Sequence, residues 1–588
     1  MLAEKSAVIG AVKRVRIWYA LIVLVMVVFL VRLFYLQVIK HDFYRKAALN
    51  SQTKEYDISA ERGAIMAHDG EEVVSLVLNE TRYLLFADPK FINNPKQTAE
   101  AVSGIIGGNQ AEYEQKLKIQ TRYVVLAKRL DKGQREKLDN LNIKGLGTRE
   151  ASQRTYPQGD LAAQVLGFVN NDGEGKYGIE QYMHSILKGK PGQLKAITDA
   201  QGVPLVTNKD NIIKQPESGK KVVLTIDVSM QRQLQDILKT GLDNAKSSSG
   251  SALVIETSTG AIKAMANYPT YNPADFYKIE DTNIFNNASV SAPLEVGSIM
   301  KPLTVAAALD QGVVKKDTTY YDPSFFVIDE AKVTNIEEDG GAGTRSIADI
   351  LQLSLNTGAV WLLQQMGGGK VNEKARVAWH NYMTNHYHFG KPTGVEQGYE
   401  SGGSIPDPKD GFGLNIQFAN TAFGQGMSAT PLQVGAALAG VVNGGKYYRP
   451  RLIDSVIDVD GKQQKYAPQI VGGSVVSGQV SSDIRSLMEH VVAKNYQTYS
   501  MKKPRPQYII GGKTGTAEIP KSGGGYYDNK FNGTFMGFVG GDNAQYVVVV
   551  RVNEPGIAGY AGSKAAAPIF GALTDMLIDN FNVAPKST

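Results

Sequence analysis

The segment 297-GSIMKP-302 is the part of the sequence from which the fold and chemistry of this chain can be argued. It places Ser298 and Lys301 three residues apart, and residues at this spacing share one face of a helix. Pro302 is tolerated only in a first helical turn, so Ser298 is expected at a helix start, where free N–H groups favour developing negative charge. A serine hydroxyl needs a base, and a lysine can serve as one where burial or a nearby cation lowers its pKa. Ser298 is therefore the candidate nucleophile and Lys301 its candidate base.

A serine and a lysine at this spacing are weakly specific by themselves. The chain contains four other such pairs, which we expect to be solvated surface pairs: Ser51/Lys54, Ser185/Lys188, Ser218/Lys221 and Ser500/Lys503. Lys-Thr-Gly likewise occurs twice. Lys239-Thr240-Gly241 ends an amphipathic helical pattern, where glycine is an ordinary helix stop. Lys513-Thr514-Gly515-Thr516 follows an apolar β-prone run and is expected at a strand edge, where glycine lets another group approach the backbone.

The order of three motifs raises the specificity. Ser298-x-x-Lys301 comes first, Ser354-Leu355-Asn356 second and Lys513-Thr514-Gly515 third. Serine β-lactamases and penicillin-binding proteins carry such a triple, with Ser-Asp-Asn as one form of the middle motif. In this chain the middle motif keeps the hydroxyl and the amide, and Leu355 stands where the carboxylate would be.

Over nearly its whole length the chain resembles a class B penicillin-binding protein, a monofunctional peptidoglycan transpeptidase. Besides the triple, six segments carry the resemblance: RLFYLQV (32–38), ERGAI (61–65), RTYPQGDLAAQVLGF (154–168), YGIEQY (177–182), LTIDVSMQ (224–231) and FGQGMSATPLQ (423–433). The resemblance implies an α/β (α+β) fold. Its catalytic domain is of the penicillin-binding and serine β-lactamase type, with a mixed sheet and a helical lobe. An elongated pedestal domain and one N-terminal transmembrane helix precede it. Val296 stands here where the family usually has proline.

The resemblance also implies how the acyl-enzyme forms. Ser298 attacks the penultimate D-alanine of a donor stem peptide ending in D-Ala-D-Ala, and Lys301 takes its proton. Ser354 and Lys513 relay a proton to the leaving D-alanine, while Asn356 holds the substrate amide and orients Lys301. A β-lactam antibiotic would imitate the donor and trap Ser298.

The third motif is expected to bind the substrate through Thr514, Gly515 and Thr516. Thr514 and Thr516 bind the terminal carboxylate. The backbone N–H groups of Ser298 and Thr516 form the oxyanion hole, and losing one such donor raises a reaction barrier by roughly 3–4 kcal/mol. An amine from a second stem peptide then resolves the acyl-enzyme. The resemblance implies no cofactor.

The first forty residues contain the predicted membrane anchor. Residues 17–39 form an apolar run interrupted by Arg32, and roughly 20 residues suffice to cross a bilayer. Trp18 and Tyr35 are placed as interface anchors, and no small-residue cleavage site follows. Charge does not decide the orientation, because basic residues lie on both sides. We expect a short cytoplasmic tail and a catalytic domain outside the bacterial inner membrane.

Length and composition set the domain organisation. A chain of 588 residues is too long for one ordinary core, and the polar stretch 216–220 is the expected linker. We therefore predict a tail at residues 1–16, an anchor at 17–39, a pedestal of the dimerisation type at 40–219 and a transpeptidase domain at 220–588. Two segments, Tyr320–Gly343 and Asn385–Ser404, are expected to border the substrate groove.

Several other functions are disfavoured. The chain has no cysteine, which excludes thiolate catalysis and Cys-ligated metals. The net charge of +6 comes without a basic run, so nucleic acid is not expected as a partner. Gly512-Lys513-Thr514 is not a phosphate-binding loop, because Gln507 occupies the position of the first glycine. His386 and His388 lack supporting carboxylates or cysteines, so no metal site is expected.

Alternatives within the resemblance remain open. A β-lactamase shares the three motifs but must activate a deacylating water, and no glutamate can be assigned to that role. A membrane-anchored β-lactam sensor would be expected to carry several membrane spans or a signalling segment. Septal and elongation transpeptidases differ in partners more than in chemistry, and the compact length modestly favours the septal type. Either type would work beside a glycosyltransferase of the SEDS type, and the septal type beside other division proteins of the membrane, contacted through residues 17–39 and the pedestal.

Overall fold

The computed structural model describes the protein at residues 2–44, 53–58, 60–197, 212–335, 341–521 and 525–587. The chain forms two compact units. One comprises residues 1–61 with 189–218, and the other comprises residues 62–188 with 219–588.

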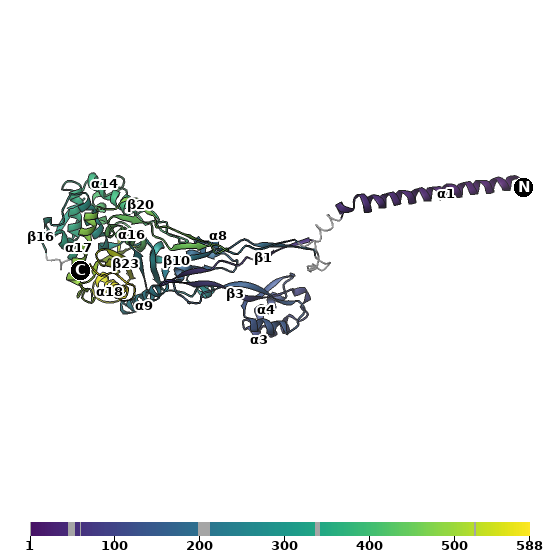
Figure 1. Ribbon diagram of the computed structural model, residues 1–588, viewed down its shortest axis with the longest axis horizontal. Coiled ribbons are helices and arrows are strands. Elements are labelled where there is room, and N and C mark those ends of the chain that lie inside the picture. The colour runs from purple at the N-terminus through teal and green to yellow at the C-terminus, as the bar shows by residue number, and fades with distance from the viewer. Residues whose placement is uncertain are drawn as a thin grey trace. The chain divides into compact units, whose positions relative to one another are not determined.

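The first unit begins with the long helix α1 (Leu2–Phe34), which continues into the π-helix η1 (Tyr35–Ile39) (Figure 1). Residues Arg14–Ile39 are long and apolar enough to cross a membrane, with a mean hydropathy of 2.7 and no buried residue. The predicted anchor at 17–39 lies inside this span. The unit also contains an antiparallel sheet of β1 (Thr53–Ile58), β8 (Gly192–Ile197) and β9 (Ile212–Lys214).

The second unit contains a seven-stranded sheet that joins distant parts of the sequence. Its strands are β2 (Ile65–Asp69), β3 (Glu72–Ala87), β4 (Val124–Leu130), β5 (Leu146–Thr155), β10 (Lys221–Asp227), β18 (Ile453–Ile457) and β19 (Gln463–Lys465). β10 pairs in parallel with β2 and antiparallel with β18. The second unit therefore contains strands of both predicted domains, the pedestal and the transpeptidase domain, in one sheet.

One face of the sheet around β3 is covered by three short helices: α3 (Pro95–Ile106), α4 (Gln110–Leu117) and α5 (Lys132–Asp139). Side chains alternate between the two faces of a strand. Tyr83 and Leu85 of β3 pack with Val102 of α3 and Leu138 of α5 in one hydrophobic cluster. Arg82 and Leu84, which alternate with them along β3, belong to the opposite face.

Short elements connect this region to the catalytic part. They are α6 (Ala163–Leu166), β6 (Phe168–Val169), β7 (Gly175–Lys176), α7 (Gly178–Tyr182) and α8 (His184–Leu187). Phe168 stacks on Phe276 with ring centroids 4.3 Å apart, and Tyr271 and Phe285 complete the aromatic cluster. Aromatic side chains from both predicted domains thus share one small core.

The catalytic part is built on a five-stranded sheet in the order β12-β11-β23-β22-β21. The strands are β11 (Ser249–Glu256), β12 (Ile262–Tyr268), β21 (Ile509–Pro520), β22 (Tyr526–Gly540) and β23 (Ala544–Asn553). The sheet combines strands from the start and from the end of this region. All four strand pairs are antiparallel, and parallel pairing is found between β2 and β10.

Helices cover both faces of this sheet (Figure 1). They are α9 (Val228–Asn244) and α18 (Ala567–Asn580) on one face, and α16 (Pro431–Val442) and α17 (Gly478–Asn495) on the other. A Cβ at Gly537 would meet Phe570 of α18, whereas one at Gly435 of α16 would meet Val549. Gly537 and Val549 belong to opposite faces, because Val549 pairs with Met536 across β22 and β23.

The residues between β12 and β21 form the predicted helical lobe. Its helices are α10 (Ala288–Ser291), α11 (Lys301–Asp310), α12 (Ile347–Gln352), α13 (Asn356–Met366), α14 (Glu373–Asn381) and α15 (Leu414–Thr421), together with α16 and α17. Two-stranded antiparallel sheets lie among them: β13 (Thr319–Asp322) with β16 (Gly343–Ser346), β14 (Phe325–Ile328) with β15 (Ala331–Thr334), and β17 (Lys446–Tyr448) with β20 (Ile470–Ser474). The predicted fold class is confirmed.

A buried ionic network holds the pedestal segments together. Glu180 of α7 is fully buried and accepts hydrogen bonds from Arg62 Nε at 2.8 Å and Arg154 Nε at 2.9 Å. Arg154 also donates to the carbonyl of Gly63 at 2.7 Å and to Asn79 Oδ1 at 2.9 Å. Burial lowers the pKa of Arg62, and the Glu180 carboxylate opposes that effect. One carboxylate therefore compensates two desolvated guanidinium groups.

Replacing this carboxylate should destabilise the protein strongly. Glu180→Gln keeps the side-chain shape but leaves two buried cations without a counter-charge, and breaking a buried pair costs about 3–5 kcal/mol. Denaturant unfolding of the detergent-solubilised chain measures the loss. Glu174→Gln is the control, because Glu174 pairs with Lys176 in solvent, with half of each side chain exposed, and should change little. Equal unfolding midpoints for the two variants would contradict the prediction.

Candidate active site

Ser298 lies on a short 3-10 turn, η5 (Gly297–Met300), that runs directly into α11. Pro302 lies in the first turn of α11, so the predicted placement of Ser298 at a helix start is confirmed. Ser298 is partly exposed, whereas Ile299 and Met300 are buried in the core. The turn therefore presents the hydroxyl from a rigid base.

Lys301 is fully buried and its ammonium is surrounded by oxygens. Its Nζ lies 2.9 Å from Ser298 Oγ, 3.1 Å from Ser354 Oγ and 2.8 Å from Asn356 Oδ1. It also donates to the backbone carbonyl of Ser354. The structure thus brings together the candidate nucleophile, the candidate base and both polar residues of the second motif.

The backbone around the second motif is unusual. Ser354 connects α12 to α13 with φ of +59°, a left-handed conformation that costs roughly 1–2 kcal/mol for a residue with a side chain. Leu355, where the motif lacks a carboxylate, is buried. Asn356 is the first residue of α13, and its amide donates to the carbonyl of Thr334 at 3.1 Å. This turn directs the Ser354 carbonyl and hydroxyl toward the same ammonium.

A second layer of polar residues, which sequence reasoning missed, supports this turn. The Thr357 hydroxyl donates to the Asp322 carboxylate at 2.6 Å, and Asn335 Nδ2 donates to the same carboxylate at 3.2 Å. The Thr357 backbone N–H donates to Asn335 Oδ1 at 3.0 Å. Asp322 and Thr357 are fully buried. The start of α13 is therefore held by side chains that no sequence motif announces.

The third motif lies on β21 as predicted. Lys513 is 1% exposed, and its Nζ lies 3.1 Å from the Thr514 carbonyl oxygen. Thr514 and Thr516 are partly exposed and alternate with buried neighbours, and Thr516 Oγ1 accepts a hydrogen bond from the Gly562 N–H at 3.1 Å. A Cβ at Gly515 would lie 2.3 Å from Thr534 Oγ1 and 2.8 Å from the Val296 carbonyl oxygen. Glycine is needed here because the chain itself packs against this backbone.

These residues line one groove with a volume of about 820 Å³. Ser298, Ser354, Asn356, Lys513, Thr514 and Thr516 all line it, while Lys301 and Gly515 lie behind its surface. Gln425 and Glu518 also line the groove and are joined by a 3.2 Å hydrogen bond. Glu518 follows Thr516 by two positions on the same strand, so period-two alternation could have indicated it.

The residues that line the groove include no described residue of the two segments predicted to border it. The first segment, Tyr320–Gly343, contains Thr334, whose carbonyl accepts a hydrogen bond from the Asn356 amide, and its residues 336–340 fall outside the described part of the chain. The second segment, Asn385–Ser404, does not line the groove. Tyr387 is fully buried and its hydroxyl donates to the Leu303 carbonyl at 2.7 Å. For Asn385–Ser404 the prediction was wrong, because Tyr387 and Phe389 pack into the core.

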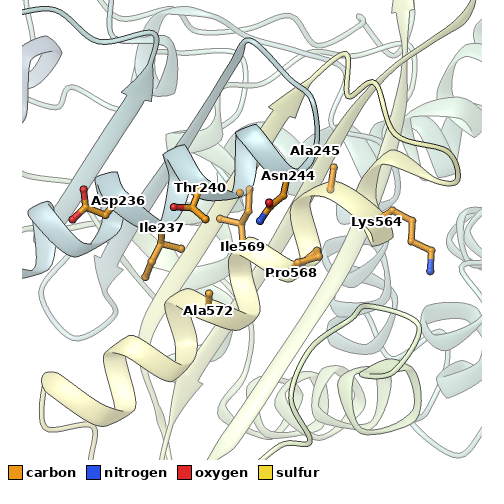
Figure 2. A pocket seen from close by; sticks show the side chains of 11 residues that line it. Asp236, Ile237, Thr240, Asn244, Ala245, Lys564, Pro568, Ile569 and Ala572 are labelled. Atoms are coloured by element: carbon orange, nitrogen blue, oxygen red, sulfur yellow. The ribbon is translucent and has the colours of Figure 1, made fainter.

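A separate hollow of about 320 Å³ lies between α9 and α18 (Figure 2). Thr240 and Gly241 of the second Lys-Thr-Gly line it, and none of the predicted site residues does. Gly241 lies inside α9 rather than at its end, so the predicted helix stop was wrong. A Cβ there would lie 2.2 Å from Ile569 Cγ1, so the glycine lets α9 and α18 pack closely.

The closeness of two backbone segments beside Ser298 leads to a test. A Cβ at Gly424 would lie 2.1 Å from the Gly297 carbonyl oxygen, and Gly424 has φ of +87°. Gly424→Ala should destabilise the protein by about 2–4 kcal/mol, since overpacking adds to left-handed strain. Gly426→Ala is the control. Gly426 has φ of +67° but its nearest neighbour is 3.6 Å away, so only strain of about 1–2 kcal/mol is expected. Thermal unfolding of both variants measures the two losses of stability, and equal losses would contradict the prediction.

Two family models match the chain. Residues 250–575 match the penicillin binding protein transpeptidase domain, and residues 57–224 match the penicillin-binding protein dimerisation domain.

Similar proteins are found among curated sequences and solved structures. Stage V sporulation protein D of Bacillus subtilis is 31% identical, covering 95% of this chain and 85% of that protein. Peptidoglycan D,D-transpeptidase FtsI of Escherichia coli is 26% identical, covering 96% and 91%. The crystal structure of penicillin binding protein 2X from Streptococcus thermophilus superposes with a TM-score of 0.69 at 23% identity, covering 91% and 83%, and shows the same fold. The chain therefore belongs to the penicillin-binding protein transpeptidase family, as a class B member that combines a dimerisation domain with a transpeptidase domain.

Proposed function

We propose that Ser298 is the nucleophile of a peptidoglycan D,D-transpeptidase that cross-links stem peptides in septal cell-wall synthesis. The observation that carries the proposal is the contact of the buried Lys301 Nζ, which acts as a base in its neutral amine form, with Ser298 Oγ, Ser354 Oγ and Asn356 Oδ1. A lysine in such a desolvated position, with hydroxyls on two sides, can accept a proton from one and return it through the other.

The acylation step follows from these positions. Ser298 Oγ attacks the carbonyl carbon of the penultimate D-alanine while its proton passes to Lys301 Nζ. The N–H groups of Ser298 and Thr516 stabilise the oxyanion. When the intermediate collapses, the peptide C–N bond breaks and Ser354, with Lys513, passes a proton to the leaving D-alanine amine. Ser354 regains its proton from Lys301, 3.1 Å away, and Lys301 is again a neutral amine. Asn356 holds the donor amide.

Deacylation completes the transfer. An amine of a second stem peptide attacks the ester carbonyl, loses a proton to Lys301 and forms the new amide bond as Ser298 regains its proton. Thr514, Gly515 and Thr516 bind the donor, with Thr514 and Thr516 facing its terminal carboxylate. Because Thr514 and Thr516 are partly exposed on the groove side of β21, they support this assignment.

Two groups of similar proteins support the septal assignment. Relatives named FtsI match over more than nine-tenths of the chain, and a sporulation protein matches with higher identity. We favour the septal type over an elongation-type transpeptidase. A β-lactam sensor or β-lactamase is the less supported alternative.

The proposed location is the bacterial inner membrane, with residues 1–16 in the cytoplasm and the transpeptidase domain outside. A peptidoglycan substrate requires the groove to face the wall, which supports this orientation where charge does not. The division at residue 219 between pedestal and transpeptidase domain stays a prediction. The proposed partners are a glycosyltransferase of the SEDS type and other membrane proteins of cell division.

The reaction of benzylpenicillin tests the nucleophile. Intact-mass analysis of the full-length protein should show one stable adduct on the wild type and none on Ser298→Ala. Ser229→Ala is the matched control, because Ser229 lies at the start of α9 with its hydroxyl on Asp69, and it should be acylated like the wild type. Drug recovered hydrolysed without a stable adduct would indicate a β-lactamase, and intact drug with no adduct would refute the Ser298 assignment.

Membrane co-purification tests the partner. The full-length protein should recover a polytopic glycan polymerase from detergent extracts, and a chain with residues 17–39 replaced by an unrelated membrane helix should recover much less. Both chains should form the benzylpenicillin adduct equally. Equal recovery of the polymerase by both chains would count against contact through the anchor.

A further inference from the structure

A basic hollow lies in the pedestal, away from the residues of the candidate active site. It has a volume of about 280 Å³ and opens on the face of the β3–β4–β5 sheet that the helices α3–α5 leave uncovered. Its cationic lining residues are Arg82, Lys128, Arg129, Arg149 and Arg154, and its lining contains no aspartate or glutamate. We propose that this hollow is a second binding site, which takes a carboxylate group of uncross-linked cell-wall peptides.

The strand register explains why the charges gather on one face. Arg149 of β5 lies opposite Leu84 of β3, and Ala151 lies opposite Arg82. Directly opposed residues share a face of the sheet. Because Tyr83 and Leu85 point into the hydrophobic cluster under the helices, Arg82 and Arg149 are directed to the bare face.

Two of the five cations have no counter-charge. Lys128 and Arg149 are exposed, and neither has an ion-pair partner in the part of the chain that the structure describes. Arg154 is bound to Glu180, and Arg82 pairs with the half-exposed Glu80 at 2.9 Å. The hollow therefore presents uncompensated positive charge, which an anion would neutralise.

The remaining cation of the lining, Arg129, is held in place by contacts with its neighbours. Its φ of +70° is left-handed, an unusual conformation for a residue inside a strand. Its guanidinium carbon lies 4.3 Å from the centre of the Tyr277 ring, and Nη1 donates to the Ala274 carbonyl at 3.2 Å. Glu174 and Asp275, which follow the lining residues Gly173 and Ala274 in the chain, pair with lysines at 2.9 Å. Neither these two acids nor Asp131, Glu150 and Asp172 line the hollow.

A buried polar atom in the lining points to a missing ligand. Tyr156 is 7% exposed, and its hydroxyl has no hydrogen-bond partner among the described residues. Burial raises the pKa of Tyr156 well above its usual value, so the hydroxyl stays a donor. Buried hydroxyls are normally paired. The Tyr156 hydroxyl lies near Arg154 and Arg62, so this donor is suited to an oxyanion. Gln153 Oε1, a second buried atom of the lining without a partner among the described residues, is suited to an N–H of the same peptide.

The cell-wall peptide is the occupant that the chemistry favours, and this identification rests on the proposed function. Its terminal carboxylate matches the planar fork of an arginine, and Phe276 and Asn170 supply an apolar wall and an amide for the peptide. A flat anionic membrane would use projecting cations rather than a hollow with a buried donor. One glycan strand of the cell wall carries many such peptides. Binding at the pedestal would therefore hold the glycan strand near the groove and raise the effective concentration of donor peptides there.

Calorimetric titration of the full-length protein in detergent tests the site. The protein is first acylated with benzylpenicillin, so that the groove is blocked, and is then titrated with soluble uncross-linked glycan strands carrying pentapeptides. The double variant Lys128→Glu/Arg149→Glu should bind at least tenfold more weakly. Lys132→Glu/Lys137→Glu, the same charge change on α5, should bind like the wild type. Equal binding by both double variants would overturn the proposal.

Further arms identify the ligand group. Tyr156→Phe should keep its thermal midpoint and lose binding several-fold, whereas unchanged binding would remove Tyr156 from the site. Strands with C-terminally amidated peptides should bind weakly. Equal binding of amidated strands, displacement of the strands by millimolar phosphate, or a stronger response to phosphatidylglycerol vesicles would overturn the carboxylate assignment. Absence of the benzylpenicillin adduct would refute the proposed reaction alone, because the comparison of double variants still reports on the pedestal.

Discussion

The burial of one cationic side chain constrains the whole catalytic region. Lys301 is fully buried, and a desolvated amine is tolerated only where oxygens replace its water. Ser298 supplies one of those oxygens, and Ser354 and Asn356 of the second motif supply the others. The 3-10 turn before α11, the left-handed Ser354 and the start of α13 must therefore all be in place together. Their neighbours belong to one hydrophobic core, so packing and chemistry are inseparable here.

The layer behind these oxygens explains how a strained turn persists. The left-handed backbone of Ser354 costs conformational free energy. The compensating contacts come from the buried Asp322 carboxylate, which accepts hydrogen bonds from Thr357 and Asn335. Strained residues of this kind persist only where the surroundings over-determine them. The pedestal follows the same logic, since Glu180 compensates Arg62 and Arg154. In both regions a buried carboxylate fixes segments that lie far apart in the sequence.

The sequence allowed the three motifs, the anchor and the fold class to be predicted, because spacing, length and order are local properties. Contacts between distant residues could not be predicted that way. Arg62 and Glu180 are 118 positions apart, and the positive φ of Ser354 has no signal in its residue type. Gly241 shows the same limit. The sequence does not distinguish a glycine that ends a helix from one that lets a side chain such as Ile569 pack closely against the helix.

The shape of the groove bears on the choice between transfer and hydrolysis. A hydrolase must hold one water against a base, whereas a transferase must admit a second peptide beside the acyl-enzyme. At about 820 Å³ the groove is near the upper end for sites that hold a drug-sized ligand, roughly 300–1,000 Å³. Glu518 lines it about 7 Å along β21 from Thr516, judging by strand rise, and accepts a hydrogen bond from Gln425. This placement beyond the motif residues suits contact with an extended peptide better than activation of a water at Ser298.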